Sequence, residues 1–376
     1  MTENITEDLR YIVALTNIRG IGAIKARLLI DTFGSARRVL EADAQSLQAL
    51  PRVGSLILEY RGEALLERAD REIRFMDDHH IRPLVYGQEG YPHRLMQCQD
   101  APALLYYLGS GNLECPHILS IVGTRACTQY GRDLVDRLLA DLKTLVPNLI
   151  VVSGLAFGID IAAHQAALTH GIPTVGVVAH GLDRIYPTAH RNTASQMIEQ
   201  GGGVITEYPT GTEPIAGNFL ARNRIIAGLA DAVLVAESRE KGGSLVTASI
   251  ATDYNRDVFA FPGRVNDDRS KGCNRLIRMN RAGLITCAQD LAESLGWCST
   301  SPKKRAVQQT IPFDDGDNLS ERGRLIVNAL RQQGDLRLTQ LADATNLDTA
   351  ILLEELLDLE LEGTIRACPG GSYRLR

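Results

Sequence analysis

Hydrophobic and polar positions follow two different periods along this chain, and the change of period divides it into segments. Over residues 9–80 apolar side chains recur at helical spacing, for example in LRYIVALTNI and ARLLIDTF. Residues 81–117 contain four prolines and no sustained period, so we expect a connector and an edge layer there. The first segment, residues 1–80, is therefore predicted to be a helical domain.

The middle of the chain has a different pattern. Six short, almost continuously apolar runs alternate with helical stretches, as expected for strands that are buried on both faces of a sheet. The runs are residues 117–123, 149–154, 174–179, 203–208, 232–237 and 257–263. Strands that alternate with helices form doubly wound parallel sheets. Residues 81–298 are therefore predicted to be one α/β domain.

The last part of the chain is a separate small module. Residues 299–318 have no periodicity and are predicted to be a linker. Three helical segments follow within residues 319–363, and the chain ends in two short apolar runs around Pro369, Gly370 and Gly371. Helices followed by a two-stranded wing are typical of a winged helix-turn-helix, so residues 319–376 are predicted to form a winged-helix domain.

A glycine pattern in the first domain resembles a helix-hairpin-helix (SAM-like) motif. Ile18-Arg19-Gly20-Ile21-Gly22 stands between two helical stretches, and a weaker copy begins at Leu50. Glycine permits the tight turn, and the following helix presents backbone N–H groups at its start. Two interpretations remain open: the turn binds a DNA phosphate, or it is a plain helical hairpin used for packing.

Charge and cysteine usage narrow the functional classes. The formal net charge is -5, so any binding of nucleic acid must come from a local basic surface. The seven cysteines show no CxxC pair and no metal-ligand spacing, which argues against a zinc site and against a disulfide framework. The polar N-terminus and the lack of an apolar run of about 18 residues predict a cytoplasmic protein without a signal peptide or membrane span.

Glycine and polar residues follow three of the predicted strands. Parallel strands place their carboxyl ends at one edge of a sheet, where ligands bind, so these loops are expected to lie together. They combine backbone N–H groups at helix starts with a basic side chain, which suits anions. The segments are Gly123–Arg125, Ser153–Asp160 and Lys241–Thr247, with Asn223 and Arg224 before the fifth strand. None matches a dinucleotide-binding or P-loop motif, so no NAD, ATP or other cofactor is expected.

Six motifs, in this order and spacing, closely resemble the DNA-processing protein A (DprA/Smf) family. They are SIVGTR, SGLAFGIDIAAHQAAL, GLDRIYPTAH, NRIIAGLADAVLVAE, GGSLVTA and FAFPG, and the resemblance covers roughly residues 85–290. It implies a Rossmann-like domain that binds single-stranded DNA and forms a homodimer. It also implies a recombination mediator that protects incoming DNA and loads the RecA recombinase during natural transformation.

The resemblance also implies which residues contact DNA, with no catalytic residue and no metal ligand. The expected nucleic-acid-binding residues are Gly123, Thr124, Arg125, Ser153, Gly154, Phe157, Gly158, Asp160, Asn223, Arg224, Lys241, Ser244 and Thr247. Phe157 departs from the family, which often has arginine at this position. Two interpretations of Phe157 remain open: its ring stacks on a base, or it is buried in the core.

The sequence argues against two other functions. A nucleotide phosphoribohydrolase on a related fold would need a carboxylate after the Gly-Gly loop, but Ala248 stands there, so we expect a protein that is not an enzyme. A transcription regulator would read duplex DNA through the winged helix. Its candidate recognition helix, residues 348–362, contains six carboxylates and no lysine or arginine, and would be repelled by phosphates.

Overall fold

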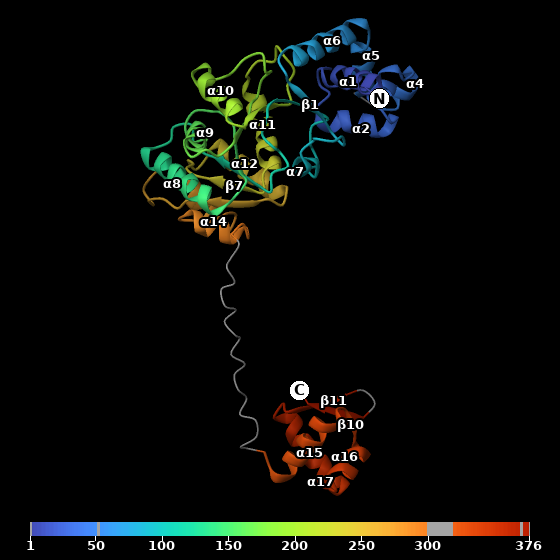
Figure 1. The fold of residues 1–376 in the computed structure, drawn as a ribbon. Coiled ribbons are helices and arrows are strands. Elements are labelled where there is room, and N and C mark those ends of the chain that lie inside the picture. Colours follow the sequence, from blue (N-terminus) through green and yellow to red (C-terminus); the bar gives the residue numbers. More distant parts are fainter. Residues whose placement is uncertain (1, 51–52, 299–318, 369–370, 376) are drawn as a thin grey trace. The chain divides into compact units, whose positions relative to one another are not determined.

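The computed structural model describes residues 2–50, 53–298, 319–368 and 371–375 of the 376-residue chain. The chain divides into two compact units, Met1–Ser299 and Thr300–Arg376, each with its own core (Figure 1). The predicted linker, residues 299–318, lies outside the described residues. Among the described residues, no helix combines the length and apolar character needed to cross a bilayer.

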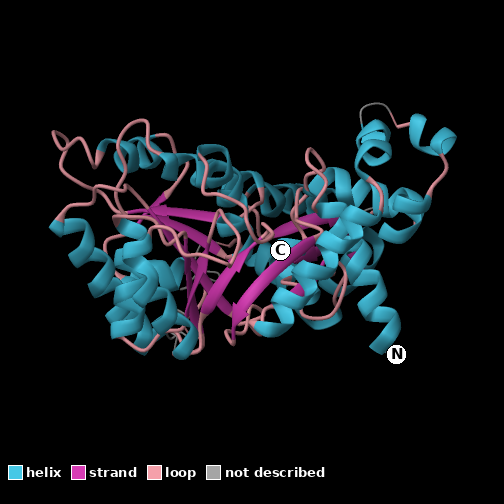
Figure 2. Ribbon diagram, turned by 90° about the horizontal axis from the view of Figure 1, so that it is seen from above, coloured by secondary structure: helices cyan, strands magenta, loops and turns pink. Residues whose placement is uncertain are grey.

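The first unit is built on a mostly parallel sheet with the order β1-β2-β6-β5-β4-β3-β7-β8-β9 (Figure 2). All six predicted strands are present and mutually parallel, which confirms the predicted fold class. They are β3 (His117–Val122), β4 (Leu149–Ser153), β5 (Thr174–Val177), β6 (Gly203–Thr206), β7 (Ala232–Val235) and β8 (Asp257–Ala260). β9 (Gly283–Leu284) adds a short parallel edge that the sequence did not predict.

Residues 81–117 complete the other edge of the sheet. β1 (Arg82–Val85) and β2 (Leu104–Gly109) pair antiparallel with each other, and β2 pairs antiparallel with β6. The short helix α7 (His93–Met96) lies between them in sequence. The predicted connector is therefore part of the sheet.

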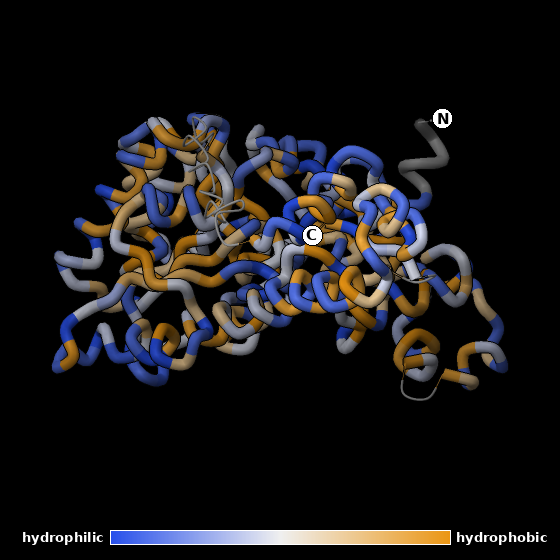
Figure 3. The backbone as a smooth tube through the Cα atoms, turned by 90° about the horizontal axis from the view of Figure 1, so that it is seen from below, coloured by the Kyte–Doolittle hydropathy of each residue, from blue (hydrophilic) through white to orange (hydrophobic). Residues whose placement is uncertain are grey.

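Alternating side chains along each strand bury both faces of the sheet. Ile118 and Val122 of β3 pack with α11, α12 and α13, whereas Leu119 and Ile121 pack with α8, α9 and α14. This is the two-residue period of a strand with an apolar layer on each side, and the central strands are correspondingly apolar in Figure 3. The helices are α8 (Gln129–Leu145), α9 (Ile159–Thr169), α10 (Arg191–Glu199), α11 (Ala216–Leu229), α12 (Gly243–Asp253), α13 (Lys271–Arg278) and α14 (Ala288–Ser294).

The strand order reverses beside β3. The chain proceeds from β3 outward through β4, β5 and β6 on one side, and β7 and β8 lie on the other. At such a point the loops after two neighbouring strands diverge and leave a crevice at the carboxyl edge, which is where ligands bind in doubly wound folds. The loops after β3 and β7 are two of the three glycine-containing loops that the sequence singled out.

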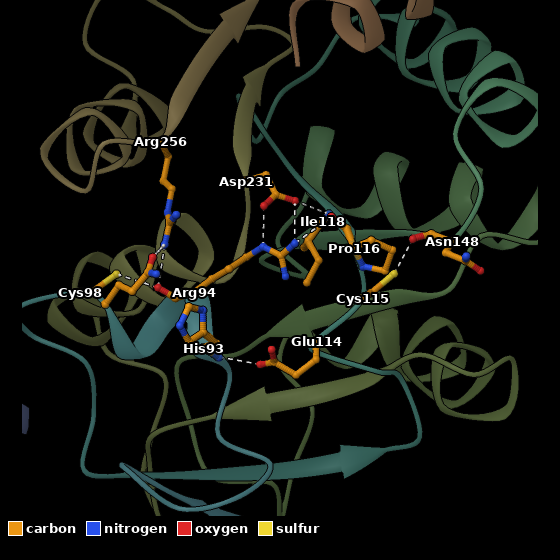
Figure 4. Close-up of polar contacts among 11 residues, drawn as sticks. His93, Arg94, Cys98, Glu114, Cys115, Pro116, Ile118, Asn148, Asp231 and Arg256 are labelled. Carbon is orange, nitrogen blue, oxygen red and sulfur yellow. Dashed lines mark hydrogen bonds and ion pairs between the residues drawn. The ribbon is translucent and has the colours of Figure 1, made fainter. Parts of the chain in front are cut away.

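Arg94 ties the antiparallel edge to the centre of the sheet (Figure 4). Its guanidinium donates to both carboxylate oxygens of Asp231, at 2.6 and 3.0 Å, and to the carbonyl of Pro116 at 2.9 Å. The same Asp231 carboxylate accepts the backbone N–H of Ile118 at 2.9 Å. This bidentate pair therefore joins α7 to the amino ends of β3 and β7, away from the crevice.

The N-terminal helices share a core with the sheet edge. Side chains of α1 and α2, such as Leu15 and Leu29, are in one apolar cluster with Leu104 and Tyr106 of β2. The described part of residues 1–80 is thus helical as predicted, within the same compact unit as the sheet. The helices are α1 (Thr2–Thr16), α2 (Ala23–Phe33), α3 (Ala36–Glu41), α4 (Ala44–Gln48), α5 (Val53–Tyr60) and α6 (Glu63–Asp78).

The glycine turn before α2 has the geometry of a tight hairpin. Gly20 has a φ of 89°, which favours glycine, and Gly22 is the N-cap of α2 without a side-chain cap. The Lys25 ammonium donates to the Gly20 carbonyl at 2.8 Å. Both the phosphate-binding and the packing interpretations of this turn stay predictions.

The second unit has three helices and a three-stranded sheet around its own apolar core, which includes Ile326, Leu341 and Leu356. Its elements are α15 (Glu321–Gln333), β10 (Leu336–Arg337), α16 (Leu338–Thr345), α17 (Thr349–Leu361), β11 (Ile365–Cys368) and β12 (Ser372–Leu375). β12 pairs with both β10 and β11. The predicted winged-helix order is confirmed, and β10 is an additional short strand.

Candidate nucleic-acid interface

A pocket of about 250 Å³ lies at the carboxyl edge of the sheet, where the strand order reverses. The loops after β3 and β7 form two of its walls, and α11 contributes a third. The lining residues are Val122, Gly123, Thr124, Arg125, Ala156, Asp160, Phe219, Leu220, Arg222, Asn223, Ile226, Arg239, Lys241, Gly242, Gly243, Ser244 and Thr247. Eight of the thirteen predicted site residues are among them, and they come from all the segments that the sequence singled out.

The loop after β3 is held in place by main-chain contacts. The Thr124 N–H donates to the Glu237 carbonyl at 2.8 Å, which ties this loop to the end of β7. A Cβ on Gly123 would lie 2.5 Å from Ile159 Cγ1, so only glycine allows this approach to α9. Arg125 is exposed, with its guanidinium carbon 5.3 Å from the centre of the Phe219 ring. Its charge is therefore available to an anion in the pocket.

The loop after β4 supports the pocket more than it lines it. Gly158 has a φ of 82°, and a Cβ there would lie 2.1 Å from the Thr124 carbonyl oxygen. The Ile159 N–H donates to that same oxygen at 3.2 Å. The Ser153 hydroxyl donates to the Ile121 carbonyl at 2.6 Å. Ser153 and Gly158 therefore fasten this loop to the β3 strand and its loop, and neither lines the pocket.

Phe157 is on the surface. Its side chain is 50% exposed, and its ring meets His190 edge-on at a centroid distance of 4.8 Å. The core interpretation is therefore wrong, because half of the residue is accessible. Phe157 is outside the pocket lining, so a role in stacking on a base stays a prediction.

Arg222 is a pocket residue that the sequence reasoning missed. It is 3% exposed, and its Nη1 donates to the carbonyls of Gly154, at 2.6 Å, and Val177. Burial lowers its pKa to about 10, an effect that Asp160 opposes, so the guanidinium is still protonated at neutral pH. The position of Arg222 directly before Asn223, already chosen from the sequence, was the available signal.

The side chains of Asp160 and Arg222 both lie close to the backbone of Gly154. A Cβ on Gly154 would lie 2.2 Å from Arg222 Nη1 and 2.5 Å from Asp160 Oδ2. Burial raises the pKa of Asp160, and the nearby Arg222 charge opposes this shift most strongly. Gly154 is therefore required for this charged pair to form the base of the pocket, although Gly154 itself is not in the lining.

The loop after β7 adds two exposed cations and a helix start. Arg239 and Lys241 are exposed in the lining, and α12 begins after Gly242 without a side-chain cap. The first N–H groups of a helix lack intrahelical partners and attract anions. Ser244 is buried and its hydroxyl donates to Ser238 Oγ at 2.9 Å, while Thr247 is also buried in the lining.

Arg224 is placed elsewhere than the sequence suggested. Its guanidinium forms an ion pair with Glu207 and donates to the Asp100 carbonyl, and both charged side chains are nearly buried, at 12% and 13% exposure. Burial raises the pKa of Glu207, and Arg224 opposes this shift. Asn223, its neighbour, does line the pocket. Arg224 thus has a structural partner on the sheet and is outside the described lining.

Positive charge dominates the pocket. Its lining contains Arg125, Arg222, Arg239 and Lys241, and the carboxylate among the lining residues is the buried Asp160. Among the described residues, no group of three or more histidine, cysteine, aspartate or glutamate side chains has the geometry of a metal site. The arrangement can therefore hold a polyanion through charge-assisted and main-chain hydrogen bonds.

These features define a class of modular α/β proteins with an anion-binding crevice. The class combines a doubly wound sheet, a basic pocket where the strand order reverses, and a winged-helix unit. Residues 82–296 match the family model for DNA recombination-mediator protein A, and residues 317–371 match that for the DprA winged helix domain. The chain belongs to the DNA processing protein A (DprA/Smf) family, as its sequence motifs predicted.

Individual relatives agree with this assignment. DNA processing protein DprA of Streptococcus pneumoniae is 43% identical over 54% of this chain and 70% of that protein. Protein Smf of Escherichia coli is 34% identical over 80% of this chain and 78% of its own length. The X-ray structure of the S. pneumoniae protein covers 75% of this chain and 95% of its own, with a TM-score of 0.63 and 32% identity.

A second solved structure concerns ligand binding. The structure reported for the single-stranded DNA binding mode of DNA processing protein A from Helicobacter pylori is 32% identical to this chain. It covers 58% of this chain and 97% of its own, with a TM-score of 0.51. The similarity therefore extends to a relative that binds single-stranded DNA.

Proposed function

We propose that this protein binds single-stranded DNA in the pocket beside β3 and β7. The observation that carries the proposal is the convergence of four basic side chains on a pocket whose lining carboxylate, Asp160, is buried beside Arg222. Phosphates of the strand lie against Arg125, Arg239 and Lys241 and against the start of α12. The H. pylori relative supports the choice of a single strand as the ligand.

The strand is bound without sequence specificity. The described pocket lining is rich in groups that suit phosphates, and two of its apolar side chains, Phe219 and Leu220, offer a base no hydrogen-bonding group. Base stacking on aromatic rings tolerates any sequence and needs unpaired bases. A duplex keeps its bases stacked inside the helix, so it gains only the phosphate contacts.

Fluorescence anisotropy of labelled oligonucleotides tests this proposal. Single-stranded and duplex DNA of the same length are titrated at one fixed salt concentration, because phosphate contacts make affinity strongly salt-dependent. We expect the protein to bind the single strand more tightly than the duplex, and Arg125→Ala to bind the single strand more weakly than the parent does. Equal affinity for both forms, or an unaffected Arg125→Ala variant, would contradict the assignment.

The cellular role follows from the family. We propose that the protein acts in the cytoplasm as a homodimeric recombination mediator that protects incoming single-stranded DNA and loads RecA during natural transformation. Three measurements test the parts separately: nuclease protection of bound DNA, light scattering for the dimer, and RecA strand exchange with and without this protein. A transformation assay on a deletion strain tests the biological setting.

The proposal assigns no catalytic activity. A phosphoribohydrolase would need an accessible acid–base carboxylate after the Gly-Gly loop, and Ala248 at that position is buried. The carboxylate that lines the pocket, Asp160, is buried beside Arg222. Incubation with nucleoside monophosphates should release no free base, and release above that of an Arg125→Ala control would restore the enzyme hypothesis.

A further inference from the structure

Helix α13 carries a row of cations on its exposed side. Lys271, Arg275 and Arg278 are spaced i, i+4 and i+7, which places them within about 60° of one another around the helix axis. All three are exposed, whereas Gly272 and Cys273 face the core. The three side chains therefore form one basic stripe, named here the α13 stripe.

The α13 stripe lies in a basic segment of a chain that has a net negative charge. The chain has 40 basic and 45 acidic side chains, but residues 264–281 contain six basic and two acidic ones. Lys271 is paired with Asp268 at 2.5 Å. Arg275 and Arg278 have no ion-pair partner among the described residues. Two neighbouring exposed guanidinium groups without a carboxylate partner can both donate to the phosphates of one polyanion.

The stripe starts at the wall of the pocket. The Gly272 N–H donates to the Ser238 carbonyl at 2.8 Å, and a Cβ on Gly272 would lie 2.4 Å from the Arg239 carbonyl oxygen. Arg239 itself lines the pocket. From this contact the eight residues of α13 extend about 12 Å, at about 1.5 Å per residue. A strand that leaves the pocket past Arg239 therefore meets Arg275 and Arg278 next.

We propose that the α13 stripe is a second phosphate-binding surface, which extends the single-stranded DNA site beyond the pocket. This inference rests on the proposed function and adds the direction in which the strand leaves the pocket. Arg275 and Arg278 contact the phosphates of nucleotides outside the pocket and read no base. Short strands that fill only the pocket do not reach the stripe, whereas longer strands do.

The test compares two oligonucleotide lengths on the full-length protein. Oligothymidylates of about 5 and about 20 nucleotides lie near the lower end and beyond the upper end of the roughly 4–16 nucleotides that one OB fold, another single-strand-binding fold, occupies. The variant is Arg275→Gln with Arg278→Gln. The control is Arg74→Gln with Arg137→Gln, which removes the same charge from exposed positions on α6 and α8, α8 being on the opposite face of the sheet. Lys271 is left unchanged because Asp268 already pairs with it.

We expect the Arg275/Arg278 variant to bind the short strand as the parent does and the long strand more weakly. Each lost phosphate contact lowers the salt slope by about 0.7, so the parent's advantage on the long strand should shrink about sevenfold when salt rises fourfold. A variant that matches the parent on the long strand at every salt concentration, or that loses no more than the control, overturns the proposal.

Three further outcomes are also decisive. If the variant binds both strands normally but changes its mass in light scattering, the stripe is a contact between copies of this chain and the proposal is wrong. If Arg125→Ala abolishes binding of both strands while the α13 variant affects neither, the proposed function stands and the extension fails. If the parent protein binds no single strand, the proposed function fails first.

Discussion

Thr128 and Glu237 link the two walls of the pocket. The Thr128 N–H donates to one oxygen of the Glu237 carboxylate at 2.8 Å, and the Thr128 hydroxyl donates to the other. Thr128 caps α8 and Glu237 lies in the loop after β7, so the contact crosses the point where the strand order reverses. Glu237 is 2% exposed, and a Cβ on Gly131 would lie 2.4 Å from Glu237 Oε2, so only glycine at position 131 leaves room for this carboxylate.

Glu237→Gln should therefore loosen the pocket. The amide oxygen of glutamine can still accept from the Thr128 N–H, but the amide nitrogen replaces the charged oxygen that accepts from the Thr128 hydroxyl, so that buried charge-assisted hydrogen bond is lost. Hydrogen bonds to charged groups contribute about 1.5–3 kcal/mol, and we expect a loss of unfolding free energy of about 2 kcal/mol with weaker binding of single-stranded DNA. Urea denaturation measures the first effect. Glu240→Gln, an exposed change in the same loop, is the control, and equal effects of the two changes would refute this role.

Arg125 and Arg224 should behave in opposite ways. Arg125→Ala removes an exposed cation from the pocket, so binding of single-stranded DNA should weaken by about 1.5–3 kcal/mol at constant stability. Arg224→Ala leaves Glu207 buried without its partner, so the unfolding free energy should fall by about 3–5 kcal/mol.

A second change separates stability from binding at Arg224. Glu207→Gln removes the buried carboxylate charge that Arg224→Ala leaves without a partner. The double variant Arg224→Ala with Glu207→Gln should therefore recover part of the stability lost in Arg224→Ala. Thermal denaturation and anisotropy are measured on the same preparations. If Arg224→Ala is stable and binds DNA poorly, Arg224 contacts the strand and the pocket extends further than its lining shows.

The contrast between Arg222 and Arg224 shows where the sequence stops being informative. The two residues are two positions apart on α11, which places them about 200° apart around the helix axis, on opposite sides. Each has one apolar neighbour, Ala221 or Ile225, and both share Asn223 as the other, so no local pattern tells which one faces the crevice. The sequence led to Arg224, whereas Arg222 lines the pocket. Only the packing of α11 against the sheet decides between them.

The strands were predictable for a physical reason. Each central strand is covered on both faces, so nearly every side chain in it must be apolar, and a continuous apolar run is a strong signal. β9 and β10 have two residues each, which is too short for any period to appear. The joining of the N-terminal helices and the sheet into one compact unit could not be predicted from the sequence either. It depends on the contact of α1 and α2 with Leu104 and Tyr106, which are far from these helices in sequence.

His164 should make the stability of the first unit depend on pH. It is fully buried, and its Nδ1 lies 2.7 Å from Thr174 Oγ1. That hydroxyl donates to the Val151 carbonyl, so it accepts from Nδ1–H. Burial lowers the pKa of His164 to about 3. Below its unfolded pKa of about 6.5, only the unfolded chain takes up this proton, so the unfolding free energy falls by about 1.4 kcal/mol per pH unit.

His164→Asn tests this dependence. The asparagine amide can still donate to Thr174 but does not titrate, so the variant should lose stability less steeply than the parent between pH 6.5 and pH 4. Urea denaturation at several pH values gives the slopes. His93→Asn, at an exposed position, is the control. Parallel slopes for the parent and His164→Asn would show that another group is responsible.

The winged-helix unit should contribute little to binding of single-stranded DNA. Between Asp348 and Glu362 the region of α17 contains six carboxylates and no cation, so phosphates are repelled from it. On the wing, Arg374 is held by an ion pair with Asp335. Leu353, Leu357 and Leu361 are exposed at 46%, 57% and 77%, in an i, i+4, i+8 row along the acidic helix. Such a surface suits a protein partner with apolar and basic side chains.

Truncation after residue 298 tests this assignment. The unit of residues 1–299 has its own core, so the truncated protein should fold and bind single-stranded DNA within about twofold of the full chain. An isolated module of residues 319–376 should bind none at the same concentration, and its folding is checked by circular dichroism. Neutralising α17 with Glu354→Gln and Asp358→Asn in the full chain removes the repulsion and should leave affinity unchanged or slightly raised. A severalfold loss on truncation, together with DNA binding by the isolated module, would instead make the winged helix part of the DNA site.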